Sequence, residues 1–257
     1  MKLVIIGGTG LIGSKLVARL REHGHEAVAA SPDTGVNTLT GEGLAGVLQA
    51  AAVVVDVSNS PSFEEKAVME FFTTSTRNLL QHAAAAAVRH YVALSVVGTE
   101  RIPDSPYLRA KHAQEALIKN AGIPYSIVHA TQFFEFIKRI ADEAFDGTTV
   151  RLPPVLIQPM AADDVANAIA RVAVGAPLNG TIDIAGPQQF RFDDLIRQGL
   201  RARNDLRDVV VDPHARYFGA ELDERSLVPA GEARLGDVHL QEWLIANVPA
   251  AAAVGNR

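Results

Sequence analysis

The amino-terminal segment reads KLVIIGGTGLIG over residues 2–13, and it determines the predicted fold class. Its first part, Lys2–Ile6, is a short apolar run, which is typical of a buried parallel strand with helices over both faces. Apolar residues then recur at helical spacing from Leu11 to Leu20. The glycines therefore fall between a strand and a helix, which is where a dinucleotide-binding loop is found.

Each glycine of this loop has a separate predicted task. Gly7 turns the chain, Gly10 lets a pyrophosphate approach the backbone, and Gly13 lets the helix pack against the strand. The amino terminus of the helix then offers its N–H groups to the anion. The other interpretation is a tight strand-to-helix turn with no ligand. The predicted cofactor contacts in the loop are Gly7, Thr9, Gly10, Leu11, Ile12 and Gly13.

Strand and helix patterns alternate about five times over residues 2–130. This alternation predicts an α/β fold, a Rossmann-like, doubly wound parallel sheet with helices on both faces. Past residue 130 the rhythm changes and prolines become frequent, so residues 1–130 are interpreted as the dinucleotide-binding core. Residues 131–257 are interpreted as a smaller substrate lobe, interleaved with the core and ending in a loose tail after Pro249.

Composition excludes several classes of protein. The 257 residues are 48% hydrophobic and 21% charged, which is ordinary for a globular chain, and they include no cysteine for disulfides or thiolate metal sites. The net charge is −5 with no basic block, so no nucleic-acid partner is expected. No apolar run is long enough for a membrane helix. The histidines show no metal-site spacing. We therefore expect a cytoplasmic protein with neither a metal nor a membrane partner.

The residue at the end of the second predicted strand selects between NAD and NADP, because a carboxylate there binds the ribose hydroxyl of NAD. Ala30 and Ser31 occupy this place. The Ser31 hydroxyl is able to donate to a 2′-phosphate, so NADP is weakly preferred, although no arginine stands beside it. Ser58 and Asn59, in a polar loop after the third strand, are predicted to line the cofactor site; an ordinary turn is the other interpretation.

Tyr107 and Lys111 lie four residues apart on a predicted helix, so they share one face. An ammonium beside a phenol stabilises phenolate and makes the tyrosine a proton donor or acceptor near neutral pH. Ser95 ends the preceding strand, where its hydroxyl could orient a carbonyl. The three residues form the predicted catalytic set, with Lys111 also bonding a nicotinamide ribose. The other interpretation is a surface tyrosine over an exposed lysine.

The chain resembles the short-chain dehydrogenase/reductase superfamily, and more narrowly its atypical NmrA-like branch of NAD(P)H-binding proteins. The segments that carry the resemblance are Gly7–Gly13, Leu94–Gly98, Tyr107–Lys111, His129–Phe133 and Ala162–Ala166. The resemblance implies that Ser95, Tyr107 and Lys111 act together with a nicotinamide, hydride leaving the ring while the tyrosine protonates the nascent alkoxide. It also implies that the backbone of His129–Phe133 borders the nicotinamide.

The expected function is therefore an NAD(P)H-dependent oxidoreductase acting on a small carbonyl, quinone or alcohol. His129 and Thr131 are predicted cofactor contacts, and His129, Gln132 and Phe133 are predicted to line the substrate pocket, with a packed histidine equally compatible with the sequence. Two alternatives stay open: a non-catalytic dinucleotide sensor and a nucleotide-sugar epimerase or dehydratase. Aromatic residues in the second lobe favour an apolar guest, and a homodimer is the default assembly.

Overall fold

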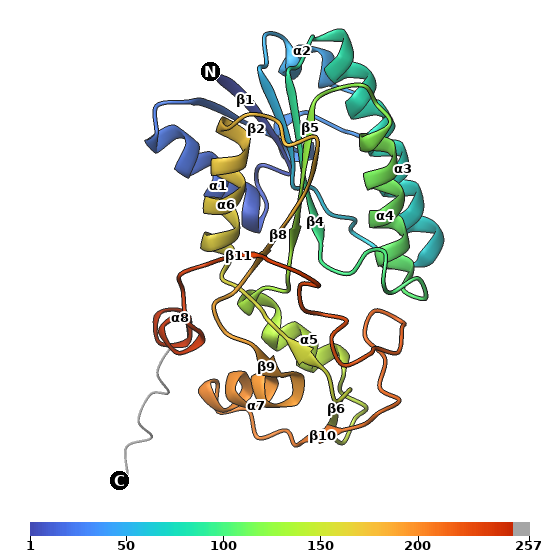
Figure 1. Cartoon of the computed structure of the whole chain (residues 1–257), viewed down its shortest axis with the longest axis vertical. Helices are drawn as coiled ribbons and strands as arrows, with labels where there is room; N and C mark the ends of the chain where they lie inside the picture. The colour runs from blue at the N-terminus through green and yellow to red at the C-terminus, as the bar shows by residue number, and fades with distance from the viewer. Residues whose placement is uncertain (249–257) are drawn as a thin grey trace.

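A computed structural model describes residues 1–248 of the chain. Its centre is a parallel sheet of seven strands in the order β11-β8-β5-β4-β3-β1-β2 (Figure 1). The strands are β1 (Lys2–Ile6), β2 (Glu26–Ala30), β3 (Val53–Asp56), β4 (His90–Val96), β5 (Tyr125–Ala130), β8 (Gly180–Ala185) and β11 (Arg234–Leu235). The doubly wound Rossmann-like fold expected from the sequence is confirmed. Chain order reverses on either side of β1, and such a switch point opens a crevice at the carboxyl ends of the strands.

Helices cover both faces of the sheet. Helices α1 (Leu11–Glu22) and α6 (Ala162–Val174) lie on one face, and α2 (Leu44–Leu48), α3 (Glu65–Ala85) and α4 (Pro106–Lys119) lie on the other (Figure 1). Because both faces are covered, alternate residues of one strand enter two separate cores. Val92 of β4 packs with α1 and α6, whereas Tyr91 and Ala93 pack with α3. This alternation decides which helices the side chains of β4 and β5 contact.

A second lobe lies beyond the carboxyl edge of the sheet (Figure 1). It has its own apolar core, which includes the fully buried Phe134 and Phe192. Its elements are α5 (Ile137–Glu143), α7 (Phe192–Ala202), α8 (Leu240–Asn247), the pair β6 (Val150–Leu152) and β10 (Val209–Val211), and the pair β7 (Leu156–Ile157) and β9 (Phe190–Arg191). Between these, α6, β8 and β11 return to the central sheet. The division at residue 130 stays a prediction.

Local contacts set two helix starts near the sheet edge. Glu64 caps α3, and its carboxylate accepts from Ala67 N at 2.9 Å. After β5, Phe134 N donates to Met160 O, and the chain forms a 3-10 turn, Phe134–Phe136, before α5. The expected tail after Pro249 lies outside the described residues.

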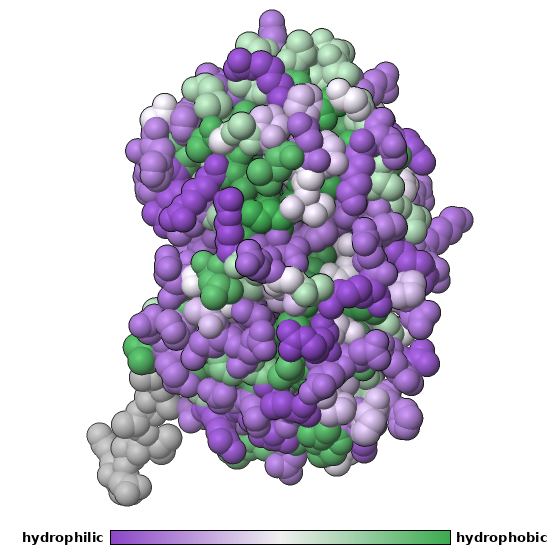
Figure 2. Space-filling view, in the orientation of Figure 1, coloured by the Kyte–Doolittle hydropathy of each residue, from purple (hydrophilic) through white to green (hydrophobic). Residues whose placement is uncertain are grey.

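Polar residues cover most of the face in Figure 2, with apolar side chains showing between them. Within the described part of the chain, no helix combines the length and apolar character needed to cross a bilayer.

Candidate functional site

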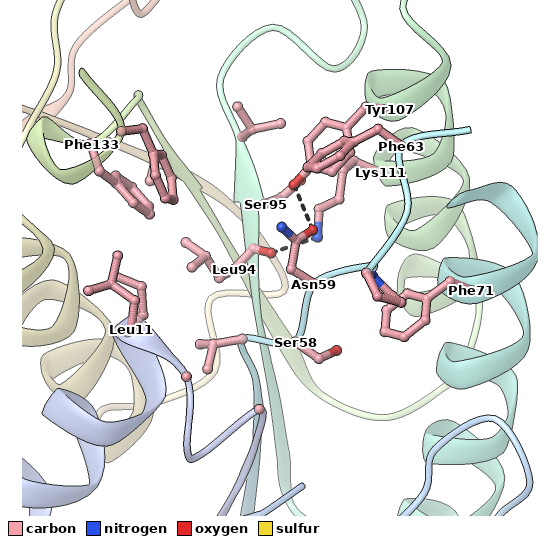
Figure 3. Close-up of a pocket in the computed structure, with 18 of the residues that line it drawn as sticks. Leu11, Ser58, Asn59, Phe63, Phe71, Leu94, Ser95, Tyr107, Lys111 and Phe133 are labelled. Atoms are coloured by element: carbon pink, nitrogen blue, oxygen red, sulfur yellow. Dashed lines mark hydrogen bonds between the residues drawn. The ribbon is translucent and has the colours of Figure 1, made fainter. Parts of the chain in front are cut away.

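One cavity of about 650 Å³ opens at the carboxyl ends of the central strands, between the sheet and the second lobe. Its volume lies within the usual range of small-molecule and cofactor sites. The glycine loop, the loops after β2 and β3, the start of α4 and the end of β5 line one part of it. Aromatic residues of the second lobe line another part, and Figure 3 shows side chains of these segments converging. The segments predicted to bind the cofactor and the residues predicted to bind the substrate therefore line the same cavity.

The glycine loop has the geometry of an anion cradle. Gly7 has a φ of +77°, a left-handed conformation that favours glycine, and a Cβ on Gly13 would lie 2.1 Å from Gly7 O. Gly10 caps α1 without a side-chain hydrogen bond, and the first turn of the helix carries no acidic residue. The first N–H groups of α1 therefore face the cavity without a competing carboxylate, as a bound pyrophosphate requires. Of the predicted loop contacts, Gly13 supports the loop from below, while Gly7, Thr9, Gly10, Leu11 and Ile12 line the cavity.

The end of β2 contributes an uncharged polar surface. Ser31 lines the cavity and is 6% exposed, and its hydroxyl oxygen has no hydrogen-bond partner among the described residues. Its backbone N–H donates to Thr34 Oγ1 at 2.9 Å, which fixes the start of a 3-10 turn, Pro32–Thr34. Asp33 does not line the cavity. Neither a ribose-binding carboxylate nor a phosphate-binding arginine stands at this position.

The loop after β3 is organised by a buried carboxylate. Asp56, 1% exposed, accepts at Oδ1 from the backbone N–H and hydroxyl of Ser58 and at Oδ2 from Gln114 Nε2 (3.0 Å) and the Tyr91 hydroxyl. These bonds hold Ser58 and the following Asn59 at the cavity wall, where the sequence predicted them.

Tyr107 stands in the first turn of α4, which Pro106 opens and the Ser105 hydroxyl caps. Its hydroxyl donates to Asn59 Oδ1 at 3.2 Å (Figure 3). Its ring is enclosed by aromatic neighbours with centroid distances between 5.3 and 5.9 Å, namely Phe63, Phe72 and Phe218. This burial raises the pKa of the Tyr107 phenol well above its ordinary value, so the residue is a neutral phenol at physiological pH.

Lys111 is buried one turn after Tyr107. Its ammonium donates to Leu94 O at 2.9 Å and to Gln114 Oε1, and it lies 4.4 Å from the centre of the Phe72 ring. Burial lowers the pKa of Lys111 to about 8, although the negative charges of Asp56 and Glu115 oppose the shift. The sequence predicted that this charge would lower the tyrosine pKa. In the structure the pKa of Tyr107 is raised instead, because desolvation by the surrounding aromatic rings dominates.

The hydroxyl of Ser95 belongs to a buried network. Ser95 Oγ donates to Glu115 Oε1 at 2.6 Å, and His129 Nε2 lies 3.0 Å from the same oxygen. His129 Nδ1 lies 3.2 Å from Asp183 Oδ1. Burial lowers the pKa of His129, but the bonds with Asp183 and Glu115 outweigh it and raise that pKa to about 9. The imidazolium therefore joins two carboxylates.

His129 was expected to line the cofactor and substrate pockets, but it is not among the residues that line the cavity. Ser95 and His129 are register partners on β4 and β5, and both side chains point to the face covered by α4. Glu115 and Asp183 then hold the imidazole on that face. Ser95 itself does border the cavity, but its hydroxyl proton is engaged by Glu115.

The segment after β5 lies where the sequence placed it. Thr131, Gln132 and Phe133 line the cavity, and Gln132 Oε1 is a buried acceptor without a partner in the described residues. Phe133 stacks on Phe136 at 5.3 Å. Phe133 and Phe136 belong to an aromatic wall of the cavity. Its other members come from the segment before α3, from α3, from α4 and from the second lobe. The wall comprises Phe63, Phe71, Tyr107, Phe133, Phe136, Tyr217 and Phe218.

Several residues of the site were not found from the sequence. Glu115 follows Lys111 by four residues and Gln114 follows it by three, so helical spacing was a signal for both. Arg139 and Glu143, paired at 2.7 Å on α5, are also four residues apart, but nothing in the sequence places α5 beside the cavity.

Near the end of α4, three potential metal ligands approach one another, the exposed Glu100 and His112 and the buried Glu115. The Lys119 ammonium lies 3.4 Å from Glu115 Oε2 and 3.9 Å from Glu100 Oε1, and supplies positive charge to this group.

Comparison with solved structures supports the fold. The chain superposes on the dTDP-glucose 4,6-dehydratase of Streptomyces venezuelae, solved with NAD and TYD, with a TM-score of 0.72 at 19% identity over 96% of each chain. It superposes on the NAD complex of Thermus thermophilus UDP-glucose 4-epimerase with a TM-score of 0.72 at 16% identity, over 96% of this chain and 98% of that one. At these identities the likeness shows a shared dehydratase and epimerase fold.

Comparison by sequence identifies more specific relatives. The photosystem II assembly factor Ycf39 of Cyanophora paradoxa is 23% identical over 215 residues, 77% of this chain and 67% of the relative. Its counterpart in Synechocystis is 20% identical over 149 residues, so this chain spans about half the length of that relative (46%). The model of a family described as NAD(P)H-binding matches residues 7–174. The glycine loop, the doubly wound sheet and this match together establish that the chain belongs to the NAD(P)H-binding family, within the short-chain dehydrogenase/reductase fold.

Proposed function

We propose that the protein is an NAD(P)H-dependent reductase of small, apolar carbonyl or quinone substrates, with Tyr107 as the proton donor. The observation that carries the proposal is the shared cavity, in which the anion cradle of the glycine loop and the Tyr107 hydroxyl face one space. A nicotinamide dinucleotide fits this arrangement, because the first turn of α1 lacks both a side-chain cap and an acid. When bound, the reduced nicotinamide supplies a hydride.

The residues of the chain supply the remaining chemistry. Tyr107 is held protonated by its aromatic surroundings, so it is a donor for an oxygen that gains negative charge, which favours reduction over oxidation. The Lys111 ammonium lines the cavity and has a third N–H beyond those that it donates to Leu94 O and Gln114 Oε1, with which it would bond the nicotinamide ribose. Ser95, Tyr107 and Lys111 all border the cavity, but Ser95 already donates its one proton to Glu115.

The aromatic wall supports an uncharged substrate. The cations that line the cavity are Lys111 and Arg139, and Arg139 is paired with Glu143. A nucleotide sugar brings a second diphosphate, which needs unpaired cations or a second helix amino terminus. This charge distribution favours a reductase over an epimerase or dehydratase, although the fold is shared with both.

A second candidate is a dinucleotide-binding regulator or assembly factor without turnover. Two observations favour it: the Ycf39 relatives are described as photosystem II assembly factors, and the Ser95 hydroxyl is committed to Glu115. The neutral, cavity-facing Tyr107 favours the reductase.

We also propose a cofactor preference, a compartment and an assembly state for the protein. NADP is weakly preferred over NAD because the Ser31 hydroxyl is a neutral donor at the end of β2. The protein acts in the cytoplasm, it functions without nucleic acid, and it assembles as a homodimer.

The test is a titration of NADPH and of NADH into the purified protein, followed by a panel of 9,10-phenanthrenequinone, menadione and 4-nitrobenzaldehyde with absorbance read at 340 nm. Enzyme-dependent oxidation of the cofactor on one of these probes supports the reductase. Tight cofactor binding with no turnover on any of them supports the regulator.

A further inference from the structure

The cavity contains a hydrogen-bond donor whose task is unassigned, the side-chain amide of Asn59. Asn59 Oδ1 accepts two hydrogen bonds, from Ser60 N at 3.0 Å and from the Tyr107 hydroxyl at 3.2 Å. A backbone N–H can only donate, so the atom facing Ser60 must be the oxygen. The orientation of the amide is thereby fixed, and Nδ2 must point the other way.

The amide nitrogen points into the cavity. Asn59 lines the cavity, and no group in the described part of the chain accepts a hydrogen bond from its Nδ2. Figure 3 shows this nitrogen turned toward the side where Leu94 and Phe133 lie. Because the Tyr107 hydroxyl donates to Oδ1, the amide N–H lies beside the phenol, whose proton stays on Asn59 Oδ1 until a substrate oxygen replaces that acceptor.

The Ser95 hydroxyl is not available as a second hydrogen-bond donor to a substrate. A hydroxyl has one proton, and Ser95 donates it to Glu115 Oε1 at 2.6 Å, on the face of β4 that α4 covers. The neighbouring β4 side chains at the cavity, Leu94 and Val96, have no donor. A carbonyl oxygen that takes the Tyr107 proton therefore has the Asn59 amide beside it as a side-chain donor.

We propose that Asn59 is a catalytic residue, whose Nδ2 amide donates to the substrate carbonyl oxygen that Tyr107 protonates; this rests on the proposed reductase function. The carbonyl carbon accepts hydride from the reduced nicotinamide, and the electron pair of the C=O π bond moves to the oxygen. Asn59 Nδ2 holds this developing alkoxide, which takes the Tyr107 proton to give the alcohol. The tyrosinate that results is reprotonated from solvent.

The test uses two substitutions of one residue, since Asn59 could instead act only by holding Tyr107. Asn59→Asp keeps an acceptor for Tyr107 and Ser60, removes the donor and adds a negative charge, whereas Asn59→Ala removes the acceptor and the donor without adding a charge. If the donor acts on the substrate, both variants lose roughly 100-fold or more in kcat, the size of effect that removal of one oxyanion donor has. The cofactor Kd and the thermal midpoint stay close to those of the unaltered protein. Asn120→Asp, at the end of α4 and outside the cavity, is the matched control.

The substrates are those of the reductase panel, and each outcome either supports or overturns the role of Asn59. Loss of kcat in both Asn59 variants with an unchanged cofactor Kd supports the inference. Retention of kcat in Asn59→Asp, with loss only in Asn59→Ala, overturns it and reduces Asn59 to a positioning residue, while the reductase function stands. Cofactor binding without turnover of any probe by the unaltered protein overturns the inference and the reductase function together, as does failure to bind either cofactor.

Discussion

The hydroxyl of Ser95 and the carboxylate of Glu115 form a 2.6 Å hydrogen bond beneath the cavity, with both side chains buried. The bond joins the end of β4 to the third turn of α4, the helix that carries Tyr107 and Lys111. Burial favours the protonated acid, but the bonds from His129 and Ser95 outweigh it and lower the pKa of Glu115 to about 2. This relationship positions the helix, and it holds the Ser95 proton on Glu115 rather than in the cavity.

Removal of the Tyr107 hydroxyl is expected to stop turnover without affecting cofactor binding. Tyr107→Phe keeps the ring in its aromatic cluster, so the fold persists, and loss of a general acid lowers kcat by about 10²–10⁴-fold. The measurement is the rate of cofactor oxidation together with the Kd of NADPH. Tyr125→Phe, at the start of β5 and away from the cavity, serves as the control. Full activity in Tyr107→Phe would remove the residue from the mechanism.

The glycine loop is expected to tolerate no side chain at Gly13. A Cβ there meets Gly7 O at 2.1 Å and Gly8 Cα at 2.7 Å, so Gly13→Ala must displace the loop or the helix. We expect a destabilisation on the order of 1–3 kcal/mol, as for other overpacking substitutions, and loss of cofactor binding. Gly46→Ala in α2 meets no atom within 4 Å and should be neutral or stabilising by up to about 1 kcal/mol. Chemical denaturation of both variants measures the contrast; equal stabilities would contradict the packing argument.

Cofactor preference is expected to follow the residue at position 31. The Ser31 oxygen is unpartnered and borders the cavity, so a charged replacement acts directly on the bound nucleotide. Ser31→Arg should shift the ratio of NADH to NADPH dissociation constants toward NADPH by roughly tenfold or more, since a charge-assisted bond to a phosphate is strong. Ser31→Asp should shift it toward NADH. Ratios that stay unchanged in both variants would place the adenosine ribose elsewhere.

The network of His129 with Glu115 and Asp183 predicts a particular dependence of stability on pH. The pKa of His129 is raised to about 9 in the folded protein, so its stabilisation is complete below the unfolded value of about 6.5 and is lost as pH rises toward 9. The pKa of Glu115 is lowered to about 2, so its contribution is present above about 4.5 and is lost as pH falls further.

Comparison of the unaltered protein with the His129→Gln variant isolates the contribution of His129 to the pH dependence of stability. Between about pH 6 and pH 9, the unaltered protein should lose on the order of 1–3 kcal/mol more of its free energy of unfolding than the variant does. The measurement is urea denaturation at both pH values. Parallel losses in the two proteins would show that His129 carries no charge in the folded state.

The sequence was sufficient for features that depend on local spacing. The strand Lys2–Ile6, the glycine loop and the i, i+4 pair of Tyr107 and Lys111 all lie within one or two turns of chain, and the structure has each where it was expected. The fold class followed because alternating strands and helices have few arrangements.

The direction in which each side chain of a buried strand points could not be predicted from the sequence. β4 is apolar on both faces because helices cover both, so its sequence does not show that Ser95 points to α4 while Leu94 points away. The direction of His129 on β5 was hidden for the same reason. The short strands β7 and β9 are each two residues long, and nothing in their sequence distinguishes them from a loop.

The most direct test of the central claim, that this cavity binds a nicotinamide dinucleotide at the glycine loop, is the paired titration of NADPH and NADH followed by nicotinamide fluorescence. The predicted result is saturable one-to-one binding of at least one dinucleotide by the unaltered protein and none by Gly13→Ala. Absence of saturable binding of either dinucleotide to the folded, unaltered protein would contradict the account.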